Sequence, residues 1–274
     1  MDDEAAPAPY TKTTMLRTVN ATRYVLPLRE GGSLPAIVEA DDLGLYVVKF
    51  RGAGQGALAL VAEIVAGEIG RALSLNIPEI VLINIDEALG RNEPDYEIRE
   101  LIKKSAGLNL ALDYLPGSTM FDRAANDKVR PEVASLAVWF DAFTMNVDRT
   151  PRNANLLVWH RKPYFIDHGA ALYFHHDWAA MMKKIKAPFA EIANHILLPW
   201  ASQIEMASNN AHERLNAPVF AEIMAAVPDA WLPTAQADAG ADEVRAAYVE
   251  FFERRLAASR IFEEEAMRAH ACLV

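Results

Sequence analysis

The segment "NVDRTPRNANLLVWHRKPYFIDHG", residues 146–169, combines a polar loop with two short apolar runs. The loop contains Asp148 and, five places later, Asn153, and a second aspartate, Asp167, follows the apolar runs. These runs flank the polar letters "HRK", a pattern that predicts a β-hairpin. The preceding stretch, "PEVASLAVWFDAFTMN", predicts a buried helix with proline in its first turn. We therefore expect a helix, a polar loop and a hairpin in this order.

The order and spacing of these three polar side chains suit phosphoryl transfer. The reaction needs a carboxylate that orients the attacking hydroxyl and accepts its proton, and it needs oxygen ligands for a Mg²⁺ ion that bridges the phosphates. Asp148 would be the base. Asn153 and Asp167 would be the ligands, because Mg²⁺ keeps several waters and needs few side chains. Asp and Asn also form turns and strand caps. The ordered set, with a hairpin inside it, favours the catalytic interpretation.

The composition is that of an ordinary globular protein. The chain has 274 residues, 52% hydrophobic and 23% charged, which is enough for one large domain or two lobes with a substantial core. Its formal net charge of −10 argues against a broad nucleic-acid surface, since such a surface needs clustered basic side chains. We therefore expect no direct nucleic-acid binding.

The sequence also lacks the signals of a secreted or membrane protein. The N-terminal letters "MDDEAAPAPYTK" have neither the basic nor the apolar region of a signal peptide. No uncharged apolar run has the length of a membrane span. The one cysteine, Cys272, excludes a disulfide framework and a cysteine-based zinc site. We expect a soluble, cytoplasmic protein that does not bind membranes.

Patterns along the chain predict an α+β fold with two lobes. Residues 1–22 are expected to form a flexible segment. Short β-rich runs with glycine-marked turns, and one main helix, predict a β-rich first lobe over residues 23–115 that binds nucleotide. Helical patterns dominate further on, and the tail repeats apolar residues at i, i+4 spacing. Residues 116–274 are expected to form a helical second lobe that holds the catalytic and metal-binding loops.

The run "LYVVK" predicts an apolar strand that ends in Lys49, where a charge is normally avoided. The next predicted helix, over residues 57–73, carries Glu63 on a face rich in Ala, Val and Ile. In kinases a lysine on such a strand binds phosphate and is held by a glutamate from the next helix. Glu68 is a competing partner, but it lies on a different side of the helix. An exposed lysine and a solvated glutamate are the alternative to this pair.

Two glycine-rich stretches are candidates for phosphate binding. In "EGGSLP", residues 30–35, the backbone N–H groups of Gly31, Gly32 and Ser33 can approach phosphate closely, because glycine has no Cβ. A plain hairpin turn is the alternative. The stretch "RGAGQG", residues 51–56, can serve the same purpose, and we rank it lower because it follows the lysine. Neither stretch is a Walker A sequence, which argues against a P-loop fold.

Three histidines, His168, His175 and His176, follow the hairpin. Adjacent histidines point in different directions on a strand or a helix. No second ligand pair at helical spacing completes a zinc set. We interpret these histidines as structural or as lining the site.

Together these stretches resemble the HipA-like kinases, relatives in fold of protein kinases and phosphatidylinositol kinases. The resemblance runs from "GGSLPAIVEADDLGLYVVKF" through "EIVAGEIGRALSLNIPE" and "NVDRTPRNANLL" to "YFIDHG" and "VPDAWLP" with the closing helix. The D-R pair in the third stretch is its most specific part, since Asp followed by Arg is usual in this group.

The resemblance implies a two-lobed, protein-kinase-like fold that uses ATP and Mg²⁺. It implies these roles: Asp148 as catalytic base, Asn153 and Asp167 as Mg²⁺ ligands, Lys49 as the ATP lysine, Glu63 as its partner, and Gly31, Gly32 and Ser33 as the cover of the phosphates. A partner protein of the toxin–antitoxin type belongs to the same resemblance. There are departures: the chain is shorter than the HipA toxins, and histidine stands where protein kinases carry the Phe of their metal-binding motif.

We therefore expect transfer of the γ-phosphoryl group of ATP to a hydroxyl, with Ser or Thr of a protein as the first choice of acceptor. Small-molecule kinases of the aminoglycoside or choline type share D-x-x-x-x-N and a later aspartate. They usually place His before the catalytic Asp, whereas Asn146 and Val147 stand there in this chain. A nucleotide-binding pseudokinase that acts as a regulatory module is a third possibility. Retention of the lysine, both aspartates and the asparagine argues against it.

Overall fold

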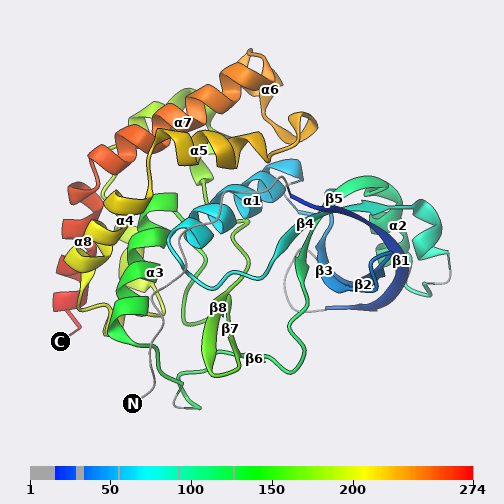
Figure 1. Cartoon of the computed structure of the whole chain (residues 1–274), viewed down its shortest axis with the longest axis horizontal. Coiled ribbons are helices and arrows are strands. Elements are labelled where there is room, and N and C mark those ends of the chain that lie inside the picture. Colours follow the sequence, from blue (N-terminus) through cyan, green and yellow to red (C-terminus); the bar gives the residue numbers. More distant parts are fainter. Residues whose placement is uncertain (1–15, 29–33, 55, 92, 126, 274) are drawn as a thin grey trace.

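The computed structural model describes residues 16–28, 34–54, 56–91, 93–125 and 127–273. Its N-terminal region is rich in strands and its C-terminal part is mostly helical, as Figure 1 shows. This arrangement confirms the predicted α+β class. None of the helices in the described ranges is long and apolar enough to cross a membrane.

The N-terminal strands form a closed barrel in the order β1-β2-β3-β5-β4. They are β1 (Thr18–Pro27), β2 (Ala36–Ala40), β3 (Leu45–Lys49), β4 (Ile80–Ile85) and β5 (Gly107–Asp113). Successive side chains of a strand point to opposite faces. Val48 of β3 is buried in the barrel interior, so Lys49 lies on the other face, beside Leu110 of β5. Leu110 belongs to the hydrophobic cluster that includes the next helix. Lys49 therefore faces that helix.

That helix, α1 (Ala57–Ala72), lies between the barrel and the C-terminal helices (Figure 1). It is buried over most of its length, as expected for a helix that is apolar on all sides. Gly67 leaves no room for a Cβ beside Ile80 of β4, and a Cβ at Gly70 would lie 3.1 Å from Ile77 Cδ1. These glycines let α1 approach β4 closely. The approach positions Glu63, one turn before Gly67, next to the barrel.

Strand β1 begins at Thr18, within the segment 1–22 that the sequence predicts to be flexible. Residues Thr18, Val19 and Asn20 pair in parallel with β4, and this pairing extends the strand toward the N-terminus. Apart from Val19, these residues are exposed, so they show little apolar alternation. A parallel partner far along the chain leaves no local signal in the sequence.

A second helix in the barrel region, α2 (Tyr96–Lys104), was not predicted. The Asp95 side chain caps it by accepting a hydrogen bond from the N–H of Glu97 at 2.9 Å. Only Ile98 and Ile102 are buried, and both pack on the hydrophobic cluster inside the barrel. The remaining letters of "YEIRELIKK" are mostly charged, which hides the short apolar stripe. The barrel region therefore contains more than the one main helix that we expected.

The C-terminal part combines a small antiparallel sheet with helices. The sheet has the order β6-β7-β8, from β6 (Thr119–Met120), β7 (Leu156–Trp159) and β8 (Lys162–Phe165). The α-helices are α3 (Pro131–Thr144), α4 (Ile204–Arg214), α5 (Ala217–Ala225), α6 (Thr234–Ala237), α7 (Ala241–Ala257) and α8 (Arg260–Ala271). Short 3₁₀ helices are η1 (Glu87–Gly90) near the barrel and η2 (Tyr173–His176), η3 (Trp178–Lys184), η4 (Ala190–Asn194), η5 (Leu198–Trp200) and η6 (Asp229–Trp231) in the C-terminal part.

The predicted order of helix, loop and hairpin is confirmed. Helix α3 starts with proline and ends at Thr144, because the next residue, Met145, has a left-handed backbone (φ 57°) that stops the helix. The hairpin of β7 and β8 turns at His160 and Arg161, with φ of 48° and 62°. Positive φ at both central residues is the geometry of a type I′ hairpin turn. The polar loop lies between these two stops, so its ends are fixed by regular structure.

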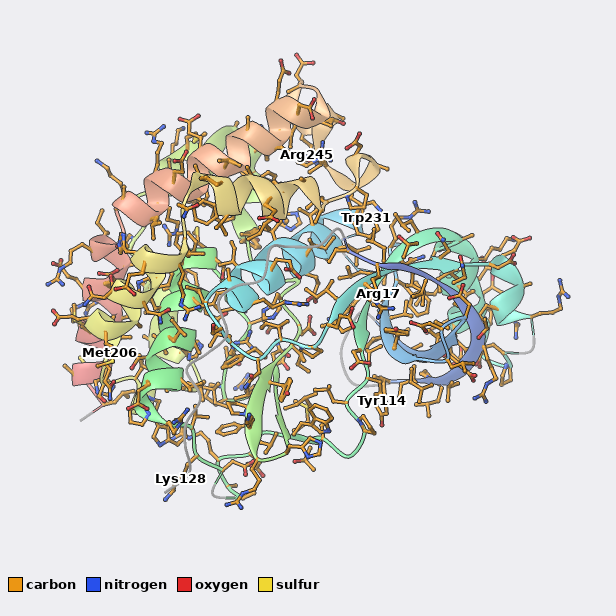
Figure 2. All side chains as sticks on the ribbon, viewed as in Figure 1. Arg17, Tyr114, Lys128, Met206, Trp231 and Arg245 are labelled. Carbon is orange, nitrogen blue, oxygen red and sulfur yellow. The ribbon has the colours of Figure 1, made fainter. Side chains whose placement is uncertain are left out.

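Long-range contacts hold the C-terminal helices together. Arg245 of α7 donates hydrogen bonds to two carbonyl oxygens, that of Met224 in the last turn of α5 and that of Val227 just after α5. Trp231 of η6 is 2% exposed and lies near α1, as Figure 2 shows. The helical part therefore packs against α1 as well as on itself. This packing gives α1 a fixed position between the barrel and the C-terminal helices.

Candidate active site

A pocket of about 250 Å³ lies where the end of β3, the start of α1, the polar loop before β7 and the segment after β8 meet. It is lined by Lys49, Phe50, Ala53, Gly54, Gly56, Ala59, Leu60, Glu63, Asp148, Asn153, Asp167, Gly169 and Ala170. Five residues predicted from the sequence thus share one pocket: Lys49 of β3, Glu63 of α1, Asp148 and Asn153 of the loop before β7, and Asp167 after β8. The predicted phosphate cover, Gly31, Gly32 and Ser33, lies outside the described residues.

Lys49 bridges two carboxylates in this pocket. Its Nζ lies 2.8 Å from Oε1 of Glu63 and 2.6 Å from Oδ1 of Asp167. The side chains of Lys49 and Glu63 are 11% and 2% exposed, whereas that of Asp167 is 41% exposed. Glu68 lies elsewhere on α1 and pairs with Arg71 at 3.6 Å. The lysine thus contacts the glutamate expected from helical spacing, and Asp167 is the carboxylate that stays open to the pocket.

Glu63 also fixes the backbone next to Asp167. Its Oε2 accepts a hydrogen bond from the N–H of His168 at 2.9 Å, and its Oε1 accepts one from the N–H of Gly169 at 3.1 Å. Asp167 itself has a left-handed backbone, with φ 55°. This conformation costs a non-glycine residue on the order of 1–3 kcal/mol and persists only where the surroundings enforce it. Glu63 is one of the groups that enforce it.

The charges in the pocket shift one another's pKa values. Burial opposes the charge of Lys49, but Glu63 and Asp167 outweigh it and raise the pKa of the ammonium group above its usual value. Burial opposes the charge of Asp167 as well, and Lys49 outweighs it and lowers the pKa of the carboxyl to about 2. For Glu63, burial is the largest effect and raises the pKa of the carboxyl, against the influence of Lys49. Asp167 is therefore ionised at neutral pH.

Asp148 is held by amide groups of its own loop. Its Oδ2 accepts hydrogen bonds from Nδ2 of Asn153 at 2.8 Å and from Nδ2 of Asn155 at 3.2 Å. The N–H of Asp148 donates to Oδ1 of Asn146 at 3.2 Å. Residues 150 and 153 also pair through their backbones. These contacts give the carboxylate a defined orientation while it remains half-buried at the pocket wall.

The donor set of the pocket is suitable for Mg²⁺. Asn153 engages its amide nitrogen with Asp148, so its amide oxygen is the atom that it can offer to a metal. The Asp167 carboxylate is ionised and partly exposed. Hard oxygen donors of this kind, completed by waters and phosphate oxygens, are what Mg²⁺ prefers. The residues in the pocket thus match the metal that the sequence pattern predicts.

Comparisons with known proteins identify the family and a similar fold. The chain matches the model of the HipA-like kinase family over residues 23–259. The chain belongs to the HipA-like kinase family. A crystal structure of the Helicobacter pylori proinflammatory kinase CtkA is similar in fold, with a TM-score of 0.51 and 13% sequence identity over 90% of this chain and 94% of that chain. No curated protein matches the sequence. Family and fold together support a phosphotransferase.

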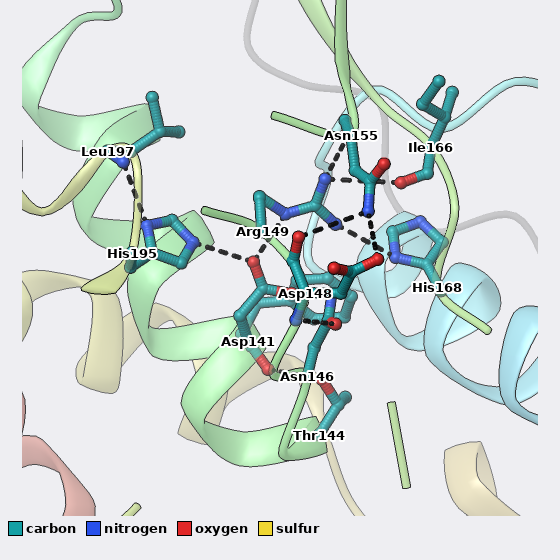
Figure 3. A network of polar contacts seen from close by, with 11 residues as sticks. Asp141, Thr144, Asn146, Asp148, Arg149, Asn155, Ile166, His168, His195 and Leu197 are labelled. Carbon is teal, nitrogen blue, oxygen red and sulfur yellow. Dashed lines mark hydrogen bonds and ion pairs between the residues drawn. The ribbon is translucent and has the colours of Figure 1, made fainter. Parts of the chain in front are cut away.

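Behind its pocket, this HipA-like kinase contains a buried polar network, drawn in Figure 3. Asp141 of α3 accepts hydrogen bonds through Oδ2 from Arg149 Nε at 2.6 Å and from His195 Nε2 at 2.8 Å. Its Oδ1 accepts one from Nδ2 of Asn146 at 2.9 Å. The N–H of Leu197 donates to Nδ1 of His195 at 3.1 Å, so the ring carries its proton on Nε2. Asp141, Arg149 and His195 are buried, and both oxygens of the Asp141 carboxylate and both ring nitrogens of His195 have hydrogen-bond partners.

The D-R pair of the sequence includes Arg149, but no role was predicted for Asp141 or His195. The available signal was Asp141, a carboxylate within the apolar run "AVWFDAF" of the α3 sequence. A buried carboxylate requires a partner, and Arg149 is that partner. Burial acts to raise the pKa of the Asp141 carboxyl, but Arg149 and His195 outweigh it and hold that pKa well below its usual range. The pair is therefore charged throughout the neutral range.

The three histidines after the hairpin do not form a common site. His168 is buried, and its Nδ1 lies 3.2 Å from Nη2 of Arg149. Burial, and to a lesser extent the charge of Arg149, lowers the pKa of its ring to about 3. His175 contacts the hydroxyl of Tyr248 at 3.2 Å, whereas His176 is exposed. A structural role for the first two agrees with the interpretation of the sequence.

The glycine-rich stretch at residues 51–56, which we ranked lower, borders the pocket. Gly54 and Gly56 line it, with φ of 50° and 68°. The ranking rested on its place after Lys49 in the sequence. Because β3 ends at Lys49 and α1 starts immediately after this loop, the chain turns back over the pocket at that point. A loop that connects two elements of a site has to pass the site, and this was a usable signal.

Proposed function

We propose that this HipA-like kinase transfers the γ-phosphoryl group of ATP, in a Mg²⁺-dependent reaction, to a hydroxyl group. The observation that carries the proposal is the pocket in which Asp148, Asn153 and Asp167 lie together with the Lys49–Glu63 ion pair. Each of these groups corresponds to a need of phosphoryl transfer, which depends on positioning and on neutralisation of phosphate charge. Family membership supports the same reaction class.

In this proposal Asp148 acts on the acceptor. Its carboxylate orients the acceptor hydroxyl and takes the proton as the oxygen bonds to the γ-phosphorus, while the bond from that phosphorus to the β–γ bridging oxygen breaks and ADP leaves. The amide bonds from Asn153 and Asn155 hold this carboxylate in one orientation. A preoriented base needs no rearrangement during the reaction.

Lys49 would bind phosphate oxygens, and Glu63 would hold it in place. Asn153 and Asp167 would hold Mg²⁺, which when bound neutralises charge on the phosphates. Gly31, Gly32 and Ser33 are proposed to cover the phosphates through backbone N–H groups. These assignments combine the chemistry of the side chains with the resemblance to the HipA-like kinases.

We also propose the two-lobed arrangement of a protein kinase, with lobes over residues 23–115 and 116–274. The closed barrel of the first part and the helical second part support it, as does the fold likeness to CtkA. A serine or threonine of a protein is the proposed acceptor, because the matching family is that of the HipA-like kinases and not a small-molecule kinase family. A toxin–antitoxin type of partner protein is part of the same proposal.

Labelled ATP tests the proposed reaction. Purified protein is incubated with γ-labelled ATP, Mg²⁺ and cell lysate, and the same mixture is run with Asp148→Asn and with excess chelator. We expect label in protein, as phosphoserine or phosphothreonine, only with the wild-type chain and Mg²⁺. Label in a small solute would replace the protein acceptor by a small molecule. No transfer in the presence of measurable ATP binding would indicate a pseudokinase.

A further inference from the structure

Arg149 contacts both chain neighbours of Asp167. The Arg149 guanidinium donates through Nη1 to the carbonyl oxygen of Ile166 at 3.3 Å, and its Nη2 lies 3.2 Å from Nδ1 of His168. Ile166 and His168 are the residues directly before and after Asp167. Arg149 thus restrains the same strained residue that Glu63 restrains from the side of α1. The contacts from Arg149 and from Glu63 together fix the orientation of the Asp167 carboxylate.

The same guanidinium also restrains the loop of Asp148. Arg149 directly follows Asp148 in the chain, and its Nη1 donates to the carbonyl oxygen of Asn155. Asn155 in turn donates to the Asp148 carboxylate and to the Asp148 carbonyl oxygen. Figure 3 shows Arg149 between these two segments. A single planar group therefore joins the loop of the proposed base to the segment of the proposed metal ligand.

The guanidinium is itself held in one orientation. Arg149 is 1% exposed, its Nε is bound to Asp141, and Asp141 is oriented in turn by Asn146 and His195. Arg149 also lies over the ring of Phe165, with Cζ 5.2 Å from the ring centroid. Only a planar fork with several donors can reach all of these acceptors at once, and a lysine ammonium cannot. The site therefore depends on arginine geometry as well as on its charge.

We infer that Arg149 is a positioning residue that sets the distance and orientation of Asp167 relative to Asp148, and so controls Mg²⁺ affinity in the pocket. The inference rests on the proposed function, because it concerns the metal site of that same pocket. Groups one shell away from a metal ligand typically alter metal affinity or activity about 10–100-fold when they are changed. We expect an effect of this size from the loss of the guanidinium geometry.

Arg255 provides a matched control. It is as deeply buried, 0% exposed, and it also binds backbone carbonyl oxygens, including those of Phe143 and Ala142 at 2.8 and 2.6 Å. These carbonyls lie in the last turn of α3, and within the described residues Arg255 makes no hydrogen bond or ion pair to the segment around Asp167 or to the loop of Asp148. Arg149→Lys and Arg255→Lys therefore remove the same fork geometry from equally buried positions, and only the first removes contacts to residues next to Asp148 and Asp167.

The test uses calorimetric titration of the full chain with a non-hydrolysable ATP analogue, with and without Mg²⁺, well below the melting temperature of each variant. For Arg149→Lys we expect unchanged affinity for the metal-free nucleotide. The increase in nucleotide affinity that Mg²⁺ brings should be about 10–100-fold smaller than in the wild type. For Arg255→Lys we expect a lower Tm and an undiminished gain from Mg²⁺. If Arg149→Lys lowers only Tm, as Arg255→Lys does, its role is structural and the inference is overturned.

His168→Phe is a milder second variant for the case that Arg149→Lys does not fold. It removes one acceptor of the guanidinium and keeps a ring beside Phe140, which now contacts His168 edge to face at 5.6 Å. We expect Mg²⁺ to increase the affinity of this variant for the nucleotide less than it does in the wild type, by a smaller margin than for Arg149→Lys. An increase as large as in the wild type would overturn the inference. If the wild type itself gains nothing from Mg²⁺, the proposed function fails, and this inference fails with it.

Discussion

The pocket and the network behind it contain the same kinds of groups in opposite settings. In the pocket, Lys49 is shared by Glu63 and Asp167, so negative charge exceeds positive charge, and the side chain of Asp167 is 41% exposed. In the network, Asp141 and Arg149 balance each other, and both are buried. The first cluster, Lys49 with Glu63 and Asp167, is open to the pocket, and its negative charge is only partly neutralised. The second cluster, Asp141 with Arg149, is closed to solvent, and its two charges balance.

This difference indicates which cluster binds and which supports. An ionised, partly exposed carboxylate beside an asparagine oxygen can accept a cation with waters and phosphate. A buried pair whose hydrogen bonds are all used has nothing left for a ligand, and its value lies in orientation. Arg149 connects the two clusters, since it belongs to the network and contacts Ile166 and His168, the chain neighbours of Asp167. The comparison predicts that changes in the two clusters separate stability from binding.

The largest effect on stability is expected from Asp141→Asn. The change leaves the buried guanidinium of Arg149 without its carboxylate, and breaking a buried ion pair from one side costs about 3–5 kcal/mol. The matched change in the open cluster, Asp167→Asn, leaves Lys49 paired with Glu63, and the substituted side chain is 41% exposed. It should cost less than about 1 kcal/mol. Urea unfolding of both variants measures the two costs. Similar values would remove the distinction between a closed and an open cluster.

A smaller effect is expected from coupling within the pocket. Lys49→Ala and Glu63→Ala should each destabilise the protein and weaken turnover, and the double variant should lose less than the sum. Contacting residues in one ionic network typically couple by about 0.5–3 kcal/mol. A double-mutant cycle from urea unfolding measures this coupling without requiring a known acceptor.

The control for this cycle combines Lys49→Ala with Glu68→Ala. Glu68 is also a buried glutamate of α1, but its partner is Arg71. Additive costs are expected there. Additive costs for Lys49 and Glu63 as well would mean that the ion pair contributes nothing specific to the pocket.

The smallest effect concerns pH and the closed cluster. Burial, followed by opposing contacts with Asp141, leaves the pKa of His195 below its ordinary value. The unfolded chain therefore takes up a proton at this ring as the pH falls below about 6.5, before the folded protein does, and stability is lost in that range. His195→Gln keeps a donor for Asp141 and removes this proton uptake. The decline in unfolding free energy between pH 6.5 and 5 should become shallower by at most about 1.4 kcal/mol per pH unit.

Chemical denaturation at several pH values gives these slopes directly. The same series with Asp167→Asn should match the wild type above about pH 5, because the pKa of that carboxyl is lowered to about 2 and its titration lies at lower pH. An unchanged slope for His195→Gln would show that His195 is not held neutral by its burial.

The parts of the fold that were predictable have strong local signals. Helix α1 is a long apolar run, and the hairpin of β7 and β8 has two apolar runs around a polar turn. Helix α2 was missed because only Ile98 and Ile102 of its residues are buried. The first residues of β1 were missed because their partner, β4, lies more than 60 residues further along the chain. A local sequence pattern does not indicate with which distant strand a segment pairs.

The candidate site divides in the same way. The spacing of Asp148 and Asn153, and an aspartate after a hairpin, can be recognised in the sequence because the chemistry needs these side chains within short loops. The support of that site cannot, because Arg149 acts through the carbonyl oxygens of Asn155 and Ile166, and every residue has a carbonyl. Only the folded chain specifies which carbonyls an arginine reaches.

The two aspartates of the pocket offer the most direct test of the proposed kinase site. Calorimetric titration with Mg²⁺ and ATP is carried out on Asp148→Asn and Asp167→Asn, with a thermal melt of the same samples. Asp148→Asn keeps the shape of the base but cannot accept a proton. We predict that it binds Mg²⁺ and ATP like the wild type while kcat falls about 10²–10⁴-fold, the usual cost of losing a general base.

Asp167→Asn removes charge from the metal itself, so we predict weaker binding of Mg²⁺ with ATP, partly restored by excess Mg²⁺. Both variants should melt near the wild-type temperature, because neither belongs to the closed cluster. The opposite pattern, with nucleotide binding abolished in Asp148→Asn and intact in Asp167→Asn, would contradict the assigned roles.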